Sequence, residues 1–193
     1  MLYPPIQLPP WALPIAKGEA PQLLLVAGGR ASGKTGGIAR AVTSLLSTRP
    51  NLRGAIVRDY RTGAQDGALR LCRDIVAEHG IEANAPRTST RINYANGSEL
   101  FVFGSALHSE NVKELEGIDF LWAEEAQTLR PYAWELLEST IREPGCFIVL
   151  SFNPTRATDV VWRLWKEPPP YAKRVWTHPV SYTHLTLPTT PYV

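Results

Sequence analysis

The sequence has little cysteine, few histidines and no long hydrophobic run. Its two cysteines, Cys72 and Cys146, lie far apart, and its four histidines show no ligand spacing. This argues against a zinc site or a disulfide framework and fits a reducing cytoplasm. No apolar stretch approaches the roughly 20 residues that span a bilayer, so we expect no membrane association. The N-terminal stretch MLYPPIQLPPWALP has no basic start and is interrupted by prolines, unlike a secretory signal peptide.

A strong excess of charge of one sign is also absent. The 20 Lys and Arg residues against 18 Asp and Glu residues give a formal net charge of +2, which permits a nucleic-acid partner without predicting one. With 44% hydrophobic and 20% charged residues, the chain has the composition of a globular protein and not of a disordered one. Its 193 residues suffice for one well-buried domain but not for two large ones.

Short apolar runs alternate with segments of helical periodicity after a proline-rich, irregular arm over residues 1–21. This alternation predicts an α/β domain over residues 22–179, with a mostly parallel sheet covered by helices on both faces. Asn96-Gly97 between two apolar runs predicts an inserted β-hairpin over residues 91–103. The predicted strands are 23–27, 54–57, 120–123, 147–150 and 173–177, and the predicted helices are 34–49, 65–79, 131–142 and 159–166.

A glycine-rich segment between the first predicted strand and helix fits the pattern G-x-x-x-x-G-K-[ST] in full. Glycines let the backbone turn tightly and direct N–H groups at phosphate oxygens, and the following helix adds its positive dipole end. We expect the lysine to reach the β- and γ-phosphates of a nucleotide and the threonine hydroxyl to bind Mg²⁺. Alternatively, the segment is a glycine-rich loop that binds nothing. Its residues are Gly28, Gly29, Arg30, Ala31, Ser32, Gly33, Lys34 and Thr35.

Two acids, Glu124 and Glu125, follow the buried run FLWA, which we expect to be a strand beside the one that leads into this loop. An acid at the carboxyl end of such a strand can hold Mg²⁺, and a second acid can polarise an attacking water. We therefore assign Glu124, with Thr35, to the metal and Glu125 to catalysis. Alternatively, both are solvated acids that open a helix.

The segment Ser151-Phe152-Asn153-Pro154 follows another buried run, FIVL. A polar side chain at the tip of a neighbouring strand can hydrogen-bond the γ-phosphate or the attacking water and report hydrolysis to the rest of the protein. Ser151 and Asn153 have the chemistry of such a sensor. The alternative is a simple turn, since Asn-Pro is a common turn dipeptide.

Together these segments resemble the N-terminal ATPase domain of the large terminase subunit of tailed phages, a P-loop NTPase of the RecA/ASCE-like class. The likeness covers about residues 22–156 and lies in GGRASGKT, VRDYRTGAQDGALR, INYANGSELFVFGS, VKELEGIDFLWAEEAQTL, TIREPG and FIVLSFNPT. It implies a motor that hydrolyses ATP with Mg²⁺ to drive double-stranded DNA into a capsid through the portal protein. It also implies a homo-oligomeric ring, a small terminase subunit as partner and work in the cytoplasm of the bacterial host. By the same resemblance, Arg30 and Lys34 stabilise charge on the γ-phosphate, Glu124 and Glu125 are the metal-holding and catalytic acids, and Ser151 to Asn153 form the coupling motif.

The sequence departs from this family in two respects. Family members carry a C-terminal nuclease domain with clustered carboxylates, whereas only Asp159 and Glu167 are acidic after Asn153, so we expect no nuclease activity. We attribute this difference to residues 180–193, which resemble a translated sequencing adapter and from which we expect the natural protein to diverge. Alternatively, they are an ordinary disordered tail. An arginine finger supplied by a neighbouring subunit is also not identifiable. Its candidates are Lys113, Arg130 and Arg142, each of which is alternatively a surface charge.

Other features leave alternatives open. Trp11, Tyr3 and the nearby prolines either cover an adenine or, as we prefer, form an arm packed on the domain. Several arginines either track DNA or belong to a solvated helix face; they are Arg53, Arg58, Arg61, Arg70 and Arg73. Other functions to weigh are a helicase-like ATPase, a small-molecule kinase and a nucleotide-binding module without turnover.

Overall fold

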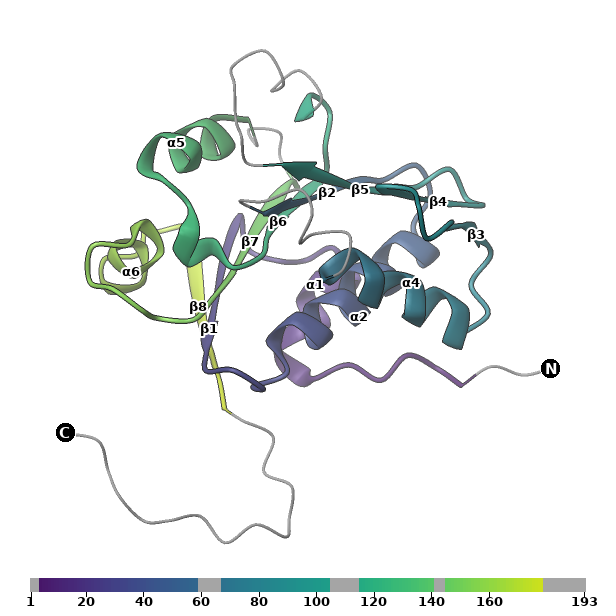
Figure 1. Cartoon of the computed structure of the whole chain (residues 1–193), viewed down its shortest axis with the longest axis horizontal. Coiled ribbons are helices and arrows are strands. Elements are labelled where there is room, and N and C mark those ends of the chain that lie inside the picture. The colour runs from purple at the N-terminus through teal and green to yellow at the C-terminus, as the bar shows by residue number, and fades with distance from the viewer. Residues whose placement is uncertain (1–3, 59–66, 105–114, 141–144, 179–193) are drawn as a thin grey trace, which may run out of the picture.

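The apolar runs of the sequence become the strands of one eight-stranded sheet in the computed structural model, which describes residues 4–58, 67–104, 115–140 and 145–178 (Figure 1). The strands are β1 (Leu23–Gly28), β2 (Arg53–Arg58), β3 (Ala83–Asn84), β4 (Arg91–Tyr94), β5 (Glu99–Gly104), β6 (Phe120–Ala123), β7 (Phe147–Phe152) and β8 (Ala172–Thr177). Every residue of β1, β6 and β7 is buried, as expected for strands covered on both faces.

The strand order is β3-β4-β5-β2-β6-β7-β1-β8. All neighbours from β5 to β8 pair in parallel, and β3, β4 and β5 pair antiparallel. This confirms the predicted mostly parallel sheet. One expectation was wrong: the strand that precedes Glu124 and Glu125, β6, does not lie beside β1, because β7 pairs with both and separates them. Short apolar runs give strands but no strand order, so the sequence alone could not place them.

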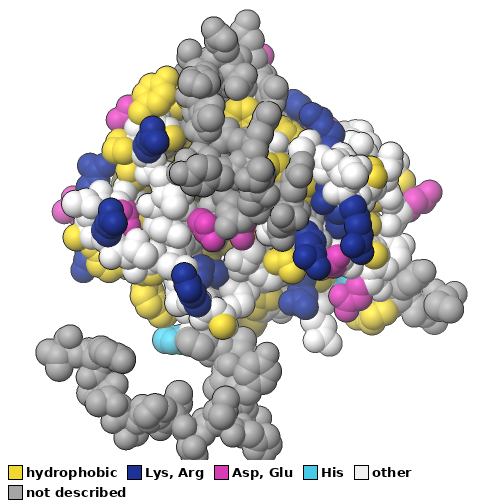
Figure 2. All heavy atoms as spheres, in the orientation of Figure 1, with side chains coloured by type: hydrophobic (Ala, Val, Ile, Leu, Met, Phe, Trp, Pro, Cys, Tyr) yellow, Lys and Arg dark blue, Asp and Glu magenta, His cyan; other side chains and the backbone are white. Residues whose placement is uncertain are grey.

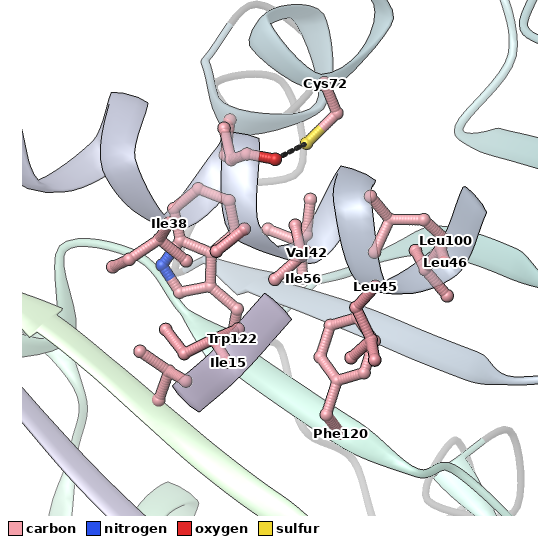
Figure 3. Packing of buried hydrophobic residues seen from close by; sticks show 14 of the residues in the cluster. Ile15, Ile38, Val42, Leu45, Leu46, Ile56, Cys72, Leu100, Phe120 and Trp122 are labelled. Carbon is pink, nitrogen blue, oxygen red and sulfur yellow. Dashed lines mark hydrogen bonds between the residues drawn. The ribbon is translucent and has the colours of Figure 1, made fainter. Parts of the chain in front are cut away.

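Helices cover both faces of the sheet, as predicted. They are α1 (Leu13–Lys17), α2 (Lys34–Thr48) and α4 (Ala68–Glu78) on one face, and α5 (Pro131–Thr140) and α6 (Val160–Lys166) on the other (Figure 1). Each face has its own apolar cluster. On the α2 side, Ile38 and Val42 pack around the fully buried Trp122 of β6 (Figure 3). Among the described residues, no helix has the length and apolar character needed to cross a membrane.

The N-terminal arm is more ordered than the sequence suggested. Residues Pro10–Ala12 form a 3₁₀ turn, η1, that leads directly into α1. Prolines stand only in the first turn of each, where the missing N–H would have no helical partner, so they do not break the helix. Ala12 and Ile15 are fully buried in the cluster that contains α2, so the arm contributes to the core.

The predicted hairpin is confirmed, and its turn also caps α2. β4 and β5 pair antiparallel, with Ile92 opposite Leu100, and Gly97 adopts a left-handed φ of 87° that favours glycine. The Asn96 side-chain amide donates hydrogen bonds to the carbonyl oxygens of Leu46 and Arg49 at 2.8 and 3.1 Å. These carbonyls lie at the C-terminal end of α2 and have no helical N–H to accept from.

Of the arginines weighed as a DNA-tracking stripe, the three whose side chains are described each have a local partner. Arg53 and Arg70 each form an ion pair with a carboxylate, and Arg73 is buried. On the face shown in Figure 2, Lys and Arg side chains lie in several separate groups. The side chain of Arg58 and the whole of Arg61 fall outside the described residues.

Candidate active site

A cavity of about 180 Å³ opens at the carboxyl ends of β1, β7 and β6. Because these three parallel strands are neighbours, the segments that follow them meet at one edge of the sheet. Most of the predicted site residues therefore come together, although they lie far apart in sequence. The cavity is lined by Arg30, Ala31, Lys34, Thr35, Glu124, Glu125, Gln127, Ser151, Phe152 and Asn153.

The loop between β1 and α2 has the geometry of an anion-binding turn. Ala31 and Gly33 adopt left-handed φ angles of 60° and 74°, so the backbone turns twice before α2 begins at Lys34. Thr35 stands in the first turn of that helix and lines the cavity. The unpaired N–H groups and the positive dipole end of α2 therefore lie at the cavity.

Gly28 and Ser32 face β8. A Cβ atom on Gly28 would lie 2.2 Å from Thr177 Oγ1 and 2.7 Å from Ser32 Oγ, so only glycine fits there. The Ser32 and Thr177 hydroxyls are hydrogen-bonded at 2.8 Å, and Thr177 Oγ1 also lies 3.1 Å from the Ala27 carbonyl oxygen. By contrast, no atom lies within 4 Å of a Cβ built on Gly29. Sequence reasoning missed Thr177, because nothing in the sequence shows that β8 pairs with β1.

Lys34 is almost completely buried and fully hydrogen-bonded. Its ammonium donates to the carbonyl oxygens of Gly28 and Gly29 at 3.1 and 3.0 Å and to Asn153 Oδ1 at 2.6 Å. Burial lowers the pKa of Lys34, while the charges of Glu124 and Glu125 oppose this shift. The two predicted acids are therefore close enough to act on the ammonium electrostatically.

The two acids differ in their environment. Glu124 is 8% exposed, and its backbone N–H donates to the Val57 carbonyl oxygen at 2.9 Å, which continues the β6–β2 pairing. Glu125 is exposed and adopts a left-handed φ of 52°, an uncommon conformation for a residue other than glycine. A short 3₁₀ turn, η3 (Ala126–Thr128), follows directly. Such strained positions gather at functional sites, and this one directs the chain away from the sheet immediately after the acids.

The two predicted sensor residues are placed differently. Ser151 Oγ accepts a hydrogen bond from Trp122 Nε1 at 2.9 Å and lies 3.4 Å from the Ala123 carbonyl oxygen, so its hydroxyl links β7 to β6. Asn153 instead contacts Lys34 with its side chain, and its backbone N–H donates to Gln127 Oε1 at 3.2 Å. Sequence reasoning did not assign a role to Gln127. The signal available was its place directly after the acids in EEAQ.

A second cavity, of about 610 Å³, lies beside the loop, between the N-terminal arm and β8. Trp11 from the arm packs so closely on α2 that a Cβ on Gly37 would lie 2.6 Å from its ring. The arm thus packs on the domain, as we preferred, and also lines this cavity. The lining residues are Gln7, Leu8, Pro9, Trp11, Ser32, Gly33, Gly37, Arg40, Trp176, Thr177 and His178.

The remaining candidates are less well placed. Lys113 and Arg142 lie outside the described residues, and Arg130 is exposed at the start of α5. Within the described ranges, no group of three or more His, Cys, Asp and Glu side chains is arranged to hold a metal ion.

Comparison with solved structures shows the same fold in large terminases. A large terminase from a thermophilic bacteriophage, in complex with ADP, aligns with a TM-score of 0.73 and 9% identity, over 93% of this chain and 48% of that one. The ATPase domain of the Thermus phage P74-26 large terminase, in a mutant form, aligns with a TM-score of 0.66 and 16% identity, over 82% and 76%. The HK97 bacteriophage large terminase aligns with a TM-score of 0.64 and 13% identity, over 86% of this chain and 38% of that one. The chain therefore spans about half the length of the thermophilic phage terminase.

The likeness confirms the predicted fold class, an α/β P-loop NTPase of the ASCE type. No curated protein sequence matches the chain. The family model for the phage terminase large subunit matches residues 22–188. This match runs past residue 180, from which we predicted that the sequence diverges from the natural protein. The match does not locate such a point, so that prediction stays untested. Since the match covers most of the sequence, the chain belongs to the phage terminase large subunit family.

Proposed function

We propose that the chain binds ATP with Mg²⁺ in the cavity at the ends of β1, β7 and β6 and hydrolyses it. The observation that carries this proposal is the meeting of Lys34, Thr35, Glu124, Glu125 and Asn153 around one cavity. An ammonium, a hydroxyl, two carboxylates and a carboxamide at the N-terminus of a helix are the groups that phosphoryl transfer uses. The large terminase of the thermophilic bacteriophage, which shares this fold, has been solved with ADP and with ATP-gamma-S.

The loop would hold the phosphates through backbone N–H groups at the start of α2, with the Lys34 ammonium on the β- and γ-phosphate oxygens. Arg30 is exposed at the rim of the cavity, where its guanidinium can reach charge that develops on the γ-phosphate. Thr35 and Glu124 offer the oxygen donors that Mg²⁺ prefers, and the residues therefore fit this ion. When bound, the ion would add positive charge next to the phosphate oxygens.

We assign the attacking water to Glu125. Its carboxylate is exposed while Glu124 is buried, so the two acids suit different tasks. A carboxylate can orient the attacking water in line with the γ-phosphate and accept a proton from that water, and this reaction depends on such positioning. Asn153, which already contacts the ammonium, can hydrogen-bond the γ-phosphate or the same water.

The second cavity suits the base of the nucleotide. It adjoins the loop at Ser32 and Gly33, and Trp11 and Trp176 contribute aromatic surface to its lining. Arg40 adds a cation on the side of α2. Aromatic side chains combined with polar groups that fix orientation are typical of small-molecule sites. The arm would then form one wall of the adenine site.

In the cell, this ATPase would drive double-stranded DNA into the phage capsid. Family membership supports this role, as does the likeness to a structure titled "The Phi-28 gp11 DNA packaging Motor", with a TM-score of 0.56 and 12% identity over 85% of this chain and 59% of that one. A ring of copies, the portal protein and a small terminase subunit would be its partners, in the cytoplasm of the bacterial host. No nuclease activity is proposed for this chain.

Phosphate release from ATP by the purified chain, with and without double-stranded DNA, tests the proposal. Lys34→Ala should abolish ATP binding, and Glu125→Gln should keep binding but block hydrolysis, with a loss of at least about 10²-fold. Exposed residues of the same types provide matched controls, Lys17→Ala and Glu135→Gln, which should behave like the parent chain. Parent-like turnover by Glu125→Gln would contradict the catalytic assignment. A parent chain that binds ATP without releasing phosphate would favour a nucleotide-binding module.

A further inference from the structure

We propose that Gln127 is a positioning residue that holds the backbone of Asn153, so that the Asn153 side chain first competes with the nucleotide for Lys34 and then turns to the attacking water. This inference rests on the proposed nucleotide site and assigns a step of its regulation. It starts from a chain of contacts around the cavity: Gln127 Oε1 accepts from the Asn153 backbone N–H at 3.2 Å, and Asn153 Oδ1 accepts from Lys34 Nζ at 2.6 Å.

The Lys34 ammonium has three N–H donors, and three protein oxygens accept from them. A phosphate oxygen that binds this ammonium must therefore replace one of the three. Two of them are the backbone carbonyl oxygens of Gly28 and Gly29. Gly28 belongs to β1 and is packed against Thr177 of β8, so its carbonyl cannot turn away without disturbing the sheet. The Asn153 carboxamide is the one acceptor on a side chain, and it can leave by rotation about its own bonds.

The backbone of Asn153 is held at a point where the sheet no longer supports it. β7 ends at Phe152, and the Asn153 N–H donates to Gln127 instead of to a neighbouring strand. Pro154 follows and disfavours helical backbone for the preceding residue. On the other side, η3, which contains Gln127, follows the acidic pair directly, and the Thr128 N–H and hydroxyl both donate to the Glu125 carbonyl oxygen at 2.9 Å. Gln127 thus ties the acidic segment to the main chain of Asn153 while leaving the Asn153 side chain able to turn.

Removal of the Gln127 side chain should therefore strengthen nucleotide binding and slow nucleotide hydrolysis. Without Gln127, the backbone of Asn153 is less constrained, its contact with Lys34 is populated less, and the nucleotide meets less competition. The same loss leaves Asn153 poorly aimed at the attacking water, so hydrolysis slows. A side chain that only stabilised the local fold would weaken both properties together.

The test measures the dissociation constant of ATPγS with Mg²⁺ and the phosphate-release rate with ATP for four chains: the parent, Gln127→Ala, Asn153→Ala and the double variant. Asn153→Ala should bind ATPγS about threefold to tenfold more tightly, which is the factor that the net contribution of one typical hydrogen bond corresponds to. Gln127→Ala should bind about twofold to fivefold more tightly and hydrolyse about tenfold more slowly. In the Asn153→Ala background, the Gln127→Ala change should add no further gain in affinity. Gln22→Ala, which replaces an exposed glutamine before β1, is the matched control and should match the parent.

Weaker binding by both single variants, unchanged binding, or additive gains in the double variant would overturn the inference. Circular dichroism and urea unfolding of each variant show whether a change in binding comes from loss of folded chain. The binding measurement does not depend on hydrolysis. A parent chain without phosphate release would therefore refute the proposed ATPase activity while the affinities still decide the role of Gln127.

Discussion

Replacing Gly28 by alanine should destabilise the fold, although alanine is in general less unfavourable than glycine inside a strand. The added Cβ would lie 2.2 Å from Thr177 Oγ1, 2.7 Å from Ser32 Oγ and 2.7 Å from the Thr177 carbonyl oxygen. The hydroxyls could rotate, but the carbonyl belongs to β8, which pairs with β1 over its whole length. Either the end of β8 moves away from β1, or the phosphate-binding loop moves with Ser32.

The cost follows from these contacts. Overpacking of one carbon in a closely packed site costs about 1–3 kcal/mol, and loss of the Ser32–Thr177 hydrogen bond adds about 1 kcal/mol. We therefore expect the free energy of unfolding to fall by about 2–4 kcal/mol. Gly29→Ala is the matched control from the same motif, because no atom lies within 4 Å of its added carbon. It should change stability by no more than about 0.5 kcal/mol.

Urea unfolding followed by circular dichroism measures both variants. With an m-value of about 2 kcal/mol/M, Gly28→Ala should lower the midpoint by about 1–2 M, while Gly29→Ala leaves it near that of the parent. Thr177→Ala should rescue Gly28→Ala only in part, since it removes the nearest oxygen but leaves the carbonyl. Equal midpoints for Gly28→Ala and Gly29→Ala would contradict this prediction. They would show that contact with β8 is not the reason why position 28 requires glycine.

Three further predictions concern other parts of the molecule. Burial raises the pKa of Glu99, but hydrogen bonds and charges from Arg53 and Arg91 outweigh burial, so the pKa is lowered. Glu99→Gln should therefore reduce the free energy of unfolding by about 1–2 kcal/mol at pH 7. In urea unfolding across pH, that cost should stay constant above about pH 4.5 and vanish as the pH falls through the folded pKa; a difference that persists in strong acid would contradict it. Trp11→Ala should weaken ATPγS binding about tenfold in a titration, by removing a wall of the second cavity, and parent-like affinity would exclude the adenine there. Trp122→Phe removes the donor to Ser151 and should cost about 1–2 kcal/mol in urea unfolding, whereas an unchanged midpoint would show that the hydrogen bond adds nothing.

Local patterns predicted much of the fold and of the site. The apolar runs predicted β1, β2, β6 and β7, residues 173–177 were predicted as the last strand, and Asn96-Gly97 predicted the hairpin. The eight residues of the motif run from the end of β1 through a turn into the first turn of α2, because their glycines and their helix signal act within one short segment. Glu124, Glu125 and Asn153 could be assigned to one edge, since strands of a parallel sheet all end there.

What could not be predicted depends on pairing between distant segments. The position of β7 between β1 and β6, the contact of Thr177 with the loop and the bond from Asn153 to Gln127 are set by strand order, which periodicity does not record. The same holds for Ser151, whose hydroxyl contacts Trp122 across the β6–β7 pair. The ordered arm was missed because its prolines suggested an irregular chain, whereas their positions in first turns allow helices.

The close fit of Gly28, Ser32 and Thr177 has a consequence for how the nucleotide site changes shape. These contacts hold the loop between β1 and α2 against the edge strand β8, so this side of the proposed nucleotide site is rigid. If the site closes around a nucleotide, the moving part is then the opposite side. There, Gln127 and Asn153 are joined by a side-chain hydrogen bond that can break and re-form. In the proposed motor, movement would then begin on the β6–β7 side and leave the β1–β8 side at rest.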